Sequence, residues 1–163
     1  ALAYGCTGLQ YFTYSLGKMI DENLTPTRAW HAAKGINTRI HAWAPVFMSC
    51  RNIGTYHHPA NLPYTRPLDR YNVGMPNDFS VSGDPVVIGQ FINDKDQEYI
   101  LIVNRNPFEP AKCYFQFGCK GDDDLQECSA GGNWKRPYPC FDRKQEIRLD
   151  PGDGRLFYVN HEL

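Results

Sequence analysis

The stretch that most constrains this chain is G-L-Q-Y-F-T-Y-S-L-G, residues 8–17. Nearly every side chain in it is apolar or aromatic, so a strand formed here would need burial on both faces. A strand that opens an independent domain usually alternates between apolar and polar side chains. We therefore expect residues 8–14 to form a parallel strand from the inside of a larger α/β structure. Ala1 is then an internal residue of a longer polypeptide, or a leader has been removed before it.

A helix is expected after this strand and a short polar loop. Thr25 can cap its N-terminus, and Pro26 suits the first helical position, where no backbone N–H is needed. Apolar residues then recur every three or four positions, which predicts an amphipathic helix that Pro45 breaks or bends. The residues of this apolar stripe are Trp30, Ala33, Ile36 or Asn37, Ile40, and Trp43 or Ala44.

The rest of the chain has a different pattern. Residues 53–84 combine proline, asparagine and aromatic residues without a period, which indicates an irregular connector with at most a short strand near 53–56. From Pro85 onward the pattern is typical of β-structure. The expected strands are residues 86–93 and 98–106, which form a hairpin, followed by 111–117, 145–149 and 155–160. We expect an antiparallel sandwich of about six to eight strands, with a long loop at 118–139.

These patterns divide the chain into three expected parts. Residues 1–52 are predicted to be one strand and one helix of an α/β barrel or of a doubly wound sheet. Residues 53–84 form the connector, and residues 85–163 form a C-terminal all-β sandwich. One strand and one helix cannot bury a barrel face by themselves. Residues 1–50 should therefore carry a large apolar surface that the upstream chain, a partner chain or the sandwich covers.

Charge and cysteine content narrow the expected partners and location. Seventeen basic and eighteen acidic residues give a net charge of -1, so we expect no nucleic acid or membrane partner and favour a neutral ligand. No apolar run reaches the roughly 20 residues that span a bilayer. Four of the six cysteines fall within one turn-rich stretch: Cys113, Cys119, Cys128 and Cys140. They form either disulfides, in a secreted or periplasmic protein, or free buried thiols. Cys6 and Cys50 are expected to be small core residues.

Candidate ligand-binding residues lie near the end of the first stretch and near Trp134. Side chains alternate along a strand, so Gln10 and Tyr14 share one face, while Thr13 lies beside them at the carboxyl end. Ligands of α/β barrels bind at that end of the strands. Tyr14 is then an aromatic surface that stacks on a sugar ring, or it is a core residue. Trp134 is either an exposed sugar-stacking residue on the long loop or a packing residue of the sandwich.

Other polar groups are less suited to chemistry. Asp21 and Glu22 are adjacent, so their carboxylates diverge and do not flank a glycosidic bond at the roughly 5 to 5.5 Å of a retaining pair. They are solvated loop residues, or they touch sugar hydroxyls at a rim. The acidic run at 122–124 is a solvated loop or a source of Ca²⁺ ligands. His57 and His58 also diverge, so we expect one packing histidine, one exposed histidine and no metal site.

A resemblance to a known family connects these segments. The ordered runs A-Y-G-C-T-G-L-Q-Y-F-T-Y, T-P-T-R-A-W-H-A-A-K-G-I-N-T-R-I and A-P-V-F-M resemble the last β/α unit of retaining glycoside hydrolases with a (β/α)8 barrel. The β-galactosidase-like and agarase-like branches are the most similar. The later runs V-I-G-Q-F, Y-I-L-I-V-N-R-N and L-D-P-G-D-G-R-L-F-Y-V resemble the β-sandwich that often follows such barrels. The resemblance covers most of the chain except residues 51–84.

The resemblance implies that residues 1–52 are the last strand and helix of a (β/α)8 barrel, an α/β barrel fragment. It also implies hydrolysis of β-linked glycosides by two carboxylates. In that family both carboxylates lie on earlier strands, so we expect no catalytic residue in this chain, no cofactor and no activity of the chain alone. Tyr14 matches the family's eighth-strand aromatic residue, which lines the sugar subsite. The expected partners are a carbohydrate substrate and an upstream barrel portion or partner chain. The competing interpretation is a non-catalytic β-sandwich module that binds carbohydrate or protein.

Overall fold

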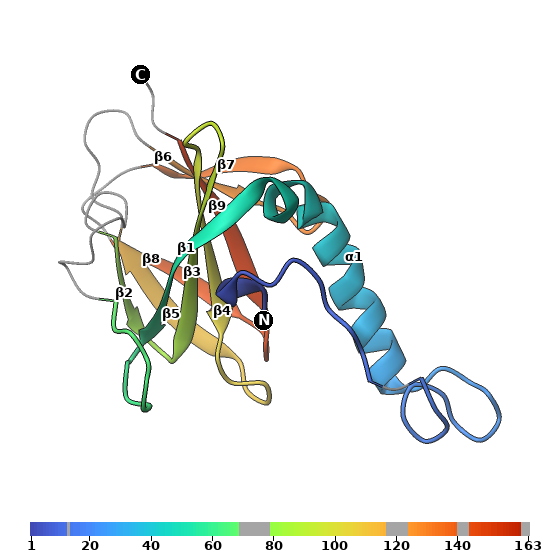
Figure 1. Cartoon of the computed structure of the whole chain (residues 1–163). Helices are drawn as coiled ribbons and strands as arrows, with labels where there is room; N and C mark the ends of the chain where they lie inside the picture. Colours follow the sequence, from blue (N-terminus) through green and yellow to red (C-terminus); the bar gives the residue numbers. More distant parts are fainter. Residues whose placement is uncertain (13, 69–78, 117–123, 140–143, 161–163) are drawn as a thin grey trace.

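The computed structural model describes residues 1–12, 14–68, 79–116, 124–139 and 144–160, with side chains undescribed at 124, 136–139 and 160 (Figure 1). These residues form a 3-10 helix, η1 (Leu2–Tyr4), one α-helix, α1 (Arg28–Ser49), and nine strands. The strands are β1 (Cys50–His58), β2 (Ser80–Gly83), β3 (Val86–Asn93), β4 (Glu98–Asn104), β5 (Ala111–Gln116), β6 (Asp124–Cys128), β7 (Trp134–Pro139), β8 (Gln145–Leu149) and β9 (Gly154–Asn160).

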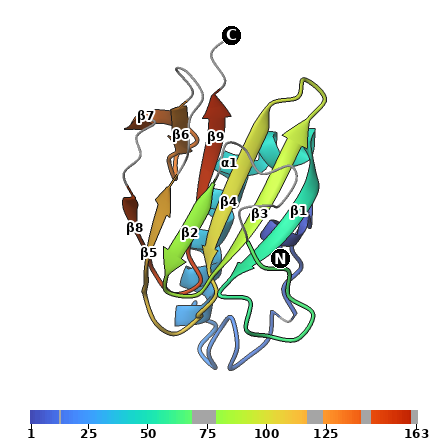
Figure 2. The same cartoon turned by 90° about the vertical axis from the view of Figure 1, so that its left-hand side faces the viewer.

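The strands form two antiparallel sheets that face each other (Figure 2). One has the order β1-β3-β4-β9-β6-β7, and the other has the order β2-β5-β8. Alternation along β5 directs Cys113 and Phe115 inward, where they share one hydrophobic core with Ile100 of β4 and Phe157 of β9. This confirms the β-sandwich that the sequence predicts. The β3–β4 hairpin is also confirmed, with Val86 opposite Asn104.

A second core covers the outer face of the six-stranded sheet. Trp43 and Phe47 of α1 are buried there against Phe91, Leu101 and Leu156 of the sheet. The central strands β3 and β4 are therefore buried on both faces, which explains why V-V-I-G-Q-F and Y-I-L-I are nearly continuous apolar runs. The sandwich and the C-terminal half of α1 form one packed unit.

The first residues of the chain are fixed to the same outer face. The backbone of η1 lies directly over Gly89, where an added Cβ would come within 2.6 Å of the Ala3 carbonyl oxygen. That carbonyl accepts hydrogen bonds from Asn52 Nδ2 at 3.2 Å and Thr55 Oγ1 at 2.9 Å. Gly5 ends η1 with a left-handed φ of 85°. The absent side chain at Gly89 is what allows this close approach.

The predicted α/β barrel fragment is wrong. The described residues of the 8–14 stretch form no strand and pair with none of the nine strands, and Thr13 lies outside the described residues. A strand buried on both faces requires neighbours for its backbone N–H and C=O groups. The strands of this chain instead pair with one another in the two sheets, and the described residues of this stretch lie outside both. The expected helix is present, but it begins at Arg28 after Thr27 rather than at Pro26.

Four strands lie wholly or partly where the sequence predicts irregular chain. The strand β1 pairs with β3 from Cys50 to His58, which is longer than the expected short strand. Strand β2 falls at the end of the expected connector. Strands β6 and β7 lie inside the expected loop at 118–139, joined by a turn in which Ser129 N–H donates to the Asn133 carbonyl at 2.8 Å. The three-part division of the chain stays a prediction.

Candidate functional site

The N-terminal half of α1 and residues 6–27 project away from the sandwich (Figure 1). The helix has 22 residues, which corresponds to a length of about 33 Å. Its buried residues, Trp43 and Phe47, both lie in the C-terminal half. Residues 6–27 run beside the helix and loop around its N-terminal end, where the Tyr11 hydroxyl donates to Asn37 Oδ1 at 2.9 Å. This part of the chain therefore gains little burial from the sandwich.

Large apolar side chains are concentrated on this projecting part. Of thirteen that are exposed among the described residues, nine lie between positions 4 and 48. We call these nine the N-terminal apolar surface: Tyr4, Leu9, Tyr11, Phe12, Tyr14, Leu16, Leu24, Ile36 and Met48. Phe12 is 99% exposed and Tyr14 is 67% exposed. The large apolar surface expected for residues 1–50 is therefore present, and the sandwich does not cover it.

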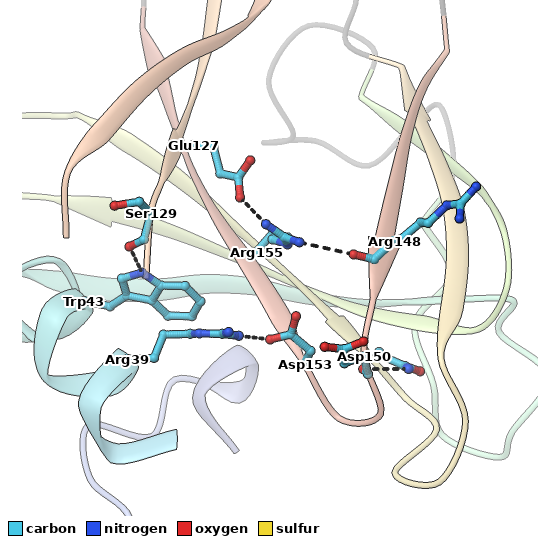
Figure 3. A network of polar contacts seen from close by, with 9 residues as sticks. Arg39, Trp43, Glu127, Ser129, Arg148, Asp150, Asp153 and Arg155 are labelled. Carbon is cyan, nitrogen blue, oxygen red and sulfur yellow. Dashed lines mark hydrogen bonds and ion pairs between the residues drawn. The ribbon is translucent and has the colours of Figure 1, made fainter. Parts of the chain in front are cut away.

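Polar contacts fix the direction in which α1 projects (Figure 3). The Trp43 indole donates to the Ser129 carbonyl at 3.2 Å, which ties the helix to the β6–β7 turn. One turn earlier, Arg39 forms an ion pair with Asp153 in the β8–β9 turn, and its guanidinium lies 5.8 Å from the Trp43 ring centroid. Two separate turns of the sandwich thus hold one helix. The projecting half of α1 therefore has a defined orientation relative to the sandwich.

The β8–β9 turn is itself held by hydrogen bonds to its backbone (Figure 3). Asn104 Nδ2 donates to the Asp150 carbonyl at 3.0 Å, and the Asn104 backbone N–H donates to the Asp153 carbonyl at 2.8 Å. Beside the turn, Arg155 Nη1 donates to Glu127 Oε1 at 2.7 Å and joins β9 to β6. The ion pair of Arg39 is therefore made with a turn whose backbone is held in place by hydrogen bonds.

The predicted site residues lie on different elements. Gln10 and Tyr14 are exposed on the projecting segment, and the structure does not describe Thr13. Trp134 is the first residue of β7, which is an edge strand, and not a residue of a long loop. Their roles in sugar binding stay predictions. The structure adds that Tyr14 faces solvent, so its ring is available to a partner or ligand.

Trp134 belongs to an aromatic cluster that sequence reasoning missed. Its ring centroid lies 6.0 Å from that of Tyr99 and 5.9 Å from that of Tyr158, and these two tyrosines are 5.3 Å apart. Tyr99 pairs with Tyr158 across β4 and β9, so the two side chains share the outer face of the sheet. The sequence signal was available: both tyrosines occur two positions from a leucine, Leu101 or Leu156, that packs on that face.

A cavity of about 460 Å³ lies beside η1, at the junction of α1, β1 and β3. Its lining residues are Tyr4, Gly5, Cys6, Thr7, Phe47, Cys50, Arg51, Asn52 and Phe91. Cys6 is exposed, so the prediction that it is a core residue is wrong, whereas Cys50 is half-buried and packs against the second core. Burial raises the pKa of the Cys50 thiol, and the Ser49 hydroxyl opposes this weakly. A thiol with a raised pKa is a poor nucleophile at neutral pH.

His57 is buried where η1 meets β1. Its Nε2 and the Tyr4 hydroxyl form a hydrogen bond of 2.9 Å. Burial, and secondarily the charge of Arg105, lower the pKa of His57 below its ordinary value. His57 is thus the expected packing histidine, kept neutral by its surroundings, whereas His58 is half-buried rather than exposed.

The described cysteines form no disulfide. Cys6, Cys50, Cys113 and Cys128 are free thiols, while Cys119 and Cys140 lie outside the described residues. Cys113 and Cys128 are buried, which matches the free-thiol alternative at these two positions. Desolvation raises the pKa of Cys113 to about 11. Both residues therefore act as small apolar side chains.

Several of the described acidic side chains have structural contacts. Glu127 and Asp153 form ion pairs with arginines, and Glu146 contacts both Lys112 and Arg148. The hydrogen bond from Lys112 lowers the pKa of Glu146, the opposite of what a catalytic acid requires. Asp21 accepts the backbone N–H groups of Asn23 and Thr25 and so orders its own loop. Within the described ranges no three His, Cys, Asp or Glu side chains are placed to hold a metal ion.

Comparisons with known proteins identify no relative of this chain. No family model matches it, no curated protein matches its sequence, and no solved structure matches its fold. Within the described ranges no helix combines the length and apolar character needed to cross a bilayer.

Proposed function

We propose that this chain is the non-catalytic β-sandwich portion of a protein that hydrolyses β-linked glycosides. The N-terminal apolar surface attaches it to the polypeptide that carries the catalytic carboxylates. The observation that carries the proposal is the N-terminal apolar surface, with nine exposed apolar side chains of which seven lie on the projecting part, beside a sandwich with a closed core. Large exposed apolar surfaces on soluble proteins mark places that another surface covers. The glycosidase identity is supported by the sequence resemblance.

The charge of α1 indicates what that covering surface contains. The helix carries Arg28, Lys34 and Arg39 and has no Asp or Glu. Arg39 is paired with Asp153, whereas Lys34 lies 5.2 Å from the centroid of the Trp30 ring on the projecting half. A partner surface with an apolar centre and carboxylates at its edge complements this arrangement. Export from the cytoplasm, to the periplasm or outside the cell, is part of the proposal, as is a carbohydrate substrate.

The test compares the isolated chain with the intact protein from its natural source. The intact protein is purified with an antibody against the sandwich, and hydrogen exchange is measured for residues 28–41 in both samples. We expect slower exchange in the intact protein, because a partner surface covers the helix. The same preparation is assayed with p-nitrophenyl β-glycosides, and hydrolysis is expected there but not with the isolated chain.

The two readouts test separate parts of the proposal. Equal exchange of residues 28–41 in both samples would contradict attachment through the N-terminal apolar surface. Slow exchange without hydrolysis of any β-glycoside would leave attachment standing and overturn the glycosidase identity. Residues 98–104 of β4 serve as the internal control, because their exchange should be slow in both samples.

A further inference from the structure

The three residues of the aromatic cluster around Trp134 differ in how far they are exposed to solvent. Tyr99 is buried in the second core, Tyr158 is half-buried, and Trp134 is 40% exposed. The two tyrosine rings support the indole from the sheet side, so Trp134 keeps its position without being covered. An exposed tryptophan with restricted motion loses little conformational entropy when a ligand binds to it.

A chain of neutral hydrogen bonds fixes the polar edge of this cluster. Asn93 Oδ1 accepts the backbone N–H groups of Lys95 and Gln97. Asn93 Nδ2 then donates to Gln97 Oε1 at 2.7 Å, and Gln97 Nε2 donates to the Tyr158 hydroxyl oxygen at 3.4 Å. The Tyr158 hydroxyl therefore acts as an acceptor within the protein, which leaves its proton available to a ligand.

We propose that Trp134, Tyr158 and Gln97 form a binding site for a neutral oligosaccharide. The Trp134 ring provides an apolar surface for the C–H face of a pyranose, and the Tyr158 hydroxyl donates to a sugar hydroxyl. The groups that make up the site are the rings of Trp134, Tyr99 and Tyr158 and the amide of Gln97. Burial and the neighbouring Cys50 and Tyr158 raise the pKa of Tyr99, so that it stays neutral. These groups favour a neutral sugar over an anionic ligand.

This site goes beyond the proposed function, because it lies on strands β7 and β9 and the β3–β4 turn rather than on the projecting half of α1. A sandwich that binds sugar here would hold its protein on a polysaccharide, whatever the reaction carried out elsewhere. If no sugar binds at this site, the proposed attachment through the N-terminal apolar surface is not contradicted. If that attachment is contradicted, the proposed sugar site is not.

The test is calorimetric titration of the 163-residue chain with cellohexaose, xylohexaose, mannohexaose and β-1,4-linked galactohexaose. We expect at least one of them to bind with a Kd of about 1 mM or tighter. Trp134→Ala should weaken that binding about tenfold or more, since the stacking surface is lost. Tyr158→Phe keeps the ring and removes the donor, and it should weaken binding by about three- to tenfold.

Phe108→Ala is the matched control, because Phe108 is an aromatic residue that is 87% exposed outside the cluster. Its affinity should equal that of the unchanged chain. Thermal unfolding of each variant separates lost binding from lost folding. Trp134→Phe retains an aromatic ring and should keep more affinity than Trp134→Ala, even if both variants are less stable. The proposal is overturned if none of the four oligosaccharides binds, or if Trp134→Ala and Phe108→Ala bind equally well.

Discussion

The sandwich and the projecting N-terminal part contain the same kinds of apolar side chain, but these side chains are buried in the sandwich and exposed on the projecting part. In the sandwich, Ile100 and Phe157 are almost completely buried between two sheets. On the projecting part, Ile36 is 50% exposed and Phe12 is almost fully exposed. The difference lies in neighbours rather than composition, because each sheet supplies the apolar face that the other needs. A helix and an extended segment without such a face must obtain burial from another surface.

The largest expected contrast is between matched core and surface truncations. Phe157→Ala removes a ring from the centre of the sandwich and should lower the free energy of unfolding by about 3 to 5 kcal/mol. Phe12→Ala removes the same group from solvent and should change it by less than about 0.5 kcal/mol. Urea unfolding of the isolated chain measures both. A loss above about 2 kcal/mol for Phe12→Ala would mean that the projecting part is packed after all.

A second contrast compares two glycines. Gly89→Ala places a methyl group against the backbone of Ala3, so it must displace η1 and should cost about 1 to 3 kcal/mol. Gly35→Ala meets no atom within 4 Å. Because alanine favours helix, this change on the projecting half of α1 should stabilise the chain by up to about 1 kcal/mol. Thermal melts of the two variants should therefore shift in opposite directions; a Gly89→Ala variant as stable as the unchanged chain would contradict the tight docking of η1.

The smallest expected effect concerns His57, at the border of the two regions. Its pKa is lowered in the folded state by burial and Arg105, so the unfolded chain binds a proton more readily. The stability that neutral His57 contributes is fully present above the unfolded pKa of about 6.5 and is lost as the pH falls through the folded pKa. The unchanged chain should therefore lose stability on acidification below about pH 6.5. His57→Gln should lose less over the same range.

The control for this pH dependence is His41→Gln, because His41 is exposed on α1. Its stability should vary with pH as that of the unchanged chain does. Urea unfolding at a series of pH values measures all three proteins. Identical pH profiles for His57→Gln and the unchanged chain would show that the burial of His57 does not disfavour its protonation.

Local patterns predicted the elements whose partners lie close in the sequence. The β3–β4 hairpin needs only two apolar runs and the short turn between them, and α1 needs only its own periodicity and a break before it. The β6–β7 hairpin was missed because the glycine-rich turn near Gly132 was taken as part of a long loop. Its strands also contain charged residues and proline, which hide the alternation.

The candidate sites depended more on contacts that are distant in sequence. Trp134 was identified from its type, but Tyr99 and Tyr158 join it through pairing of β4 with β9 and packing of β7 beside them. No local sequence pattern predicts that β4 pairs with β9. Gln10 and Tyr14 were selected on the assumption of a strand, and that assumption failed because no neighbouring strand accepts the segment.

The sequence by itself determined that the described residues after Pro85 are mostly in antiparallel strands, that a helix follows the polar loop near Thr25, and that residues 1–50 carry more apolar surface than they can bury. These properties follow from side-chain alternation, helix periodicity and composition, which are local. The tertiary structure alone decided that residues 8–14 stay outside the sheets, that η1 lies on Gly89, and that Arg39 and Trp43 hold α1 against two turns. Each of these features depends on contacts between residues that are far apart in the sequence. Hydrogen bonds and apolar burial stabilise such a contact only once folding has brought the two residues together in space, and local sequence patterns do not report this.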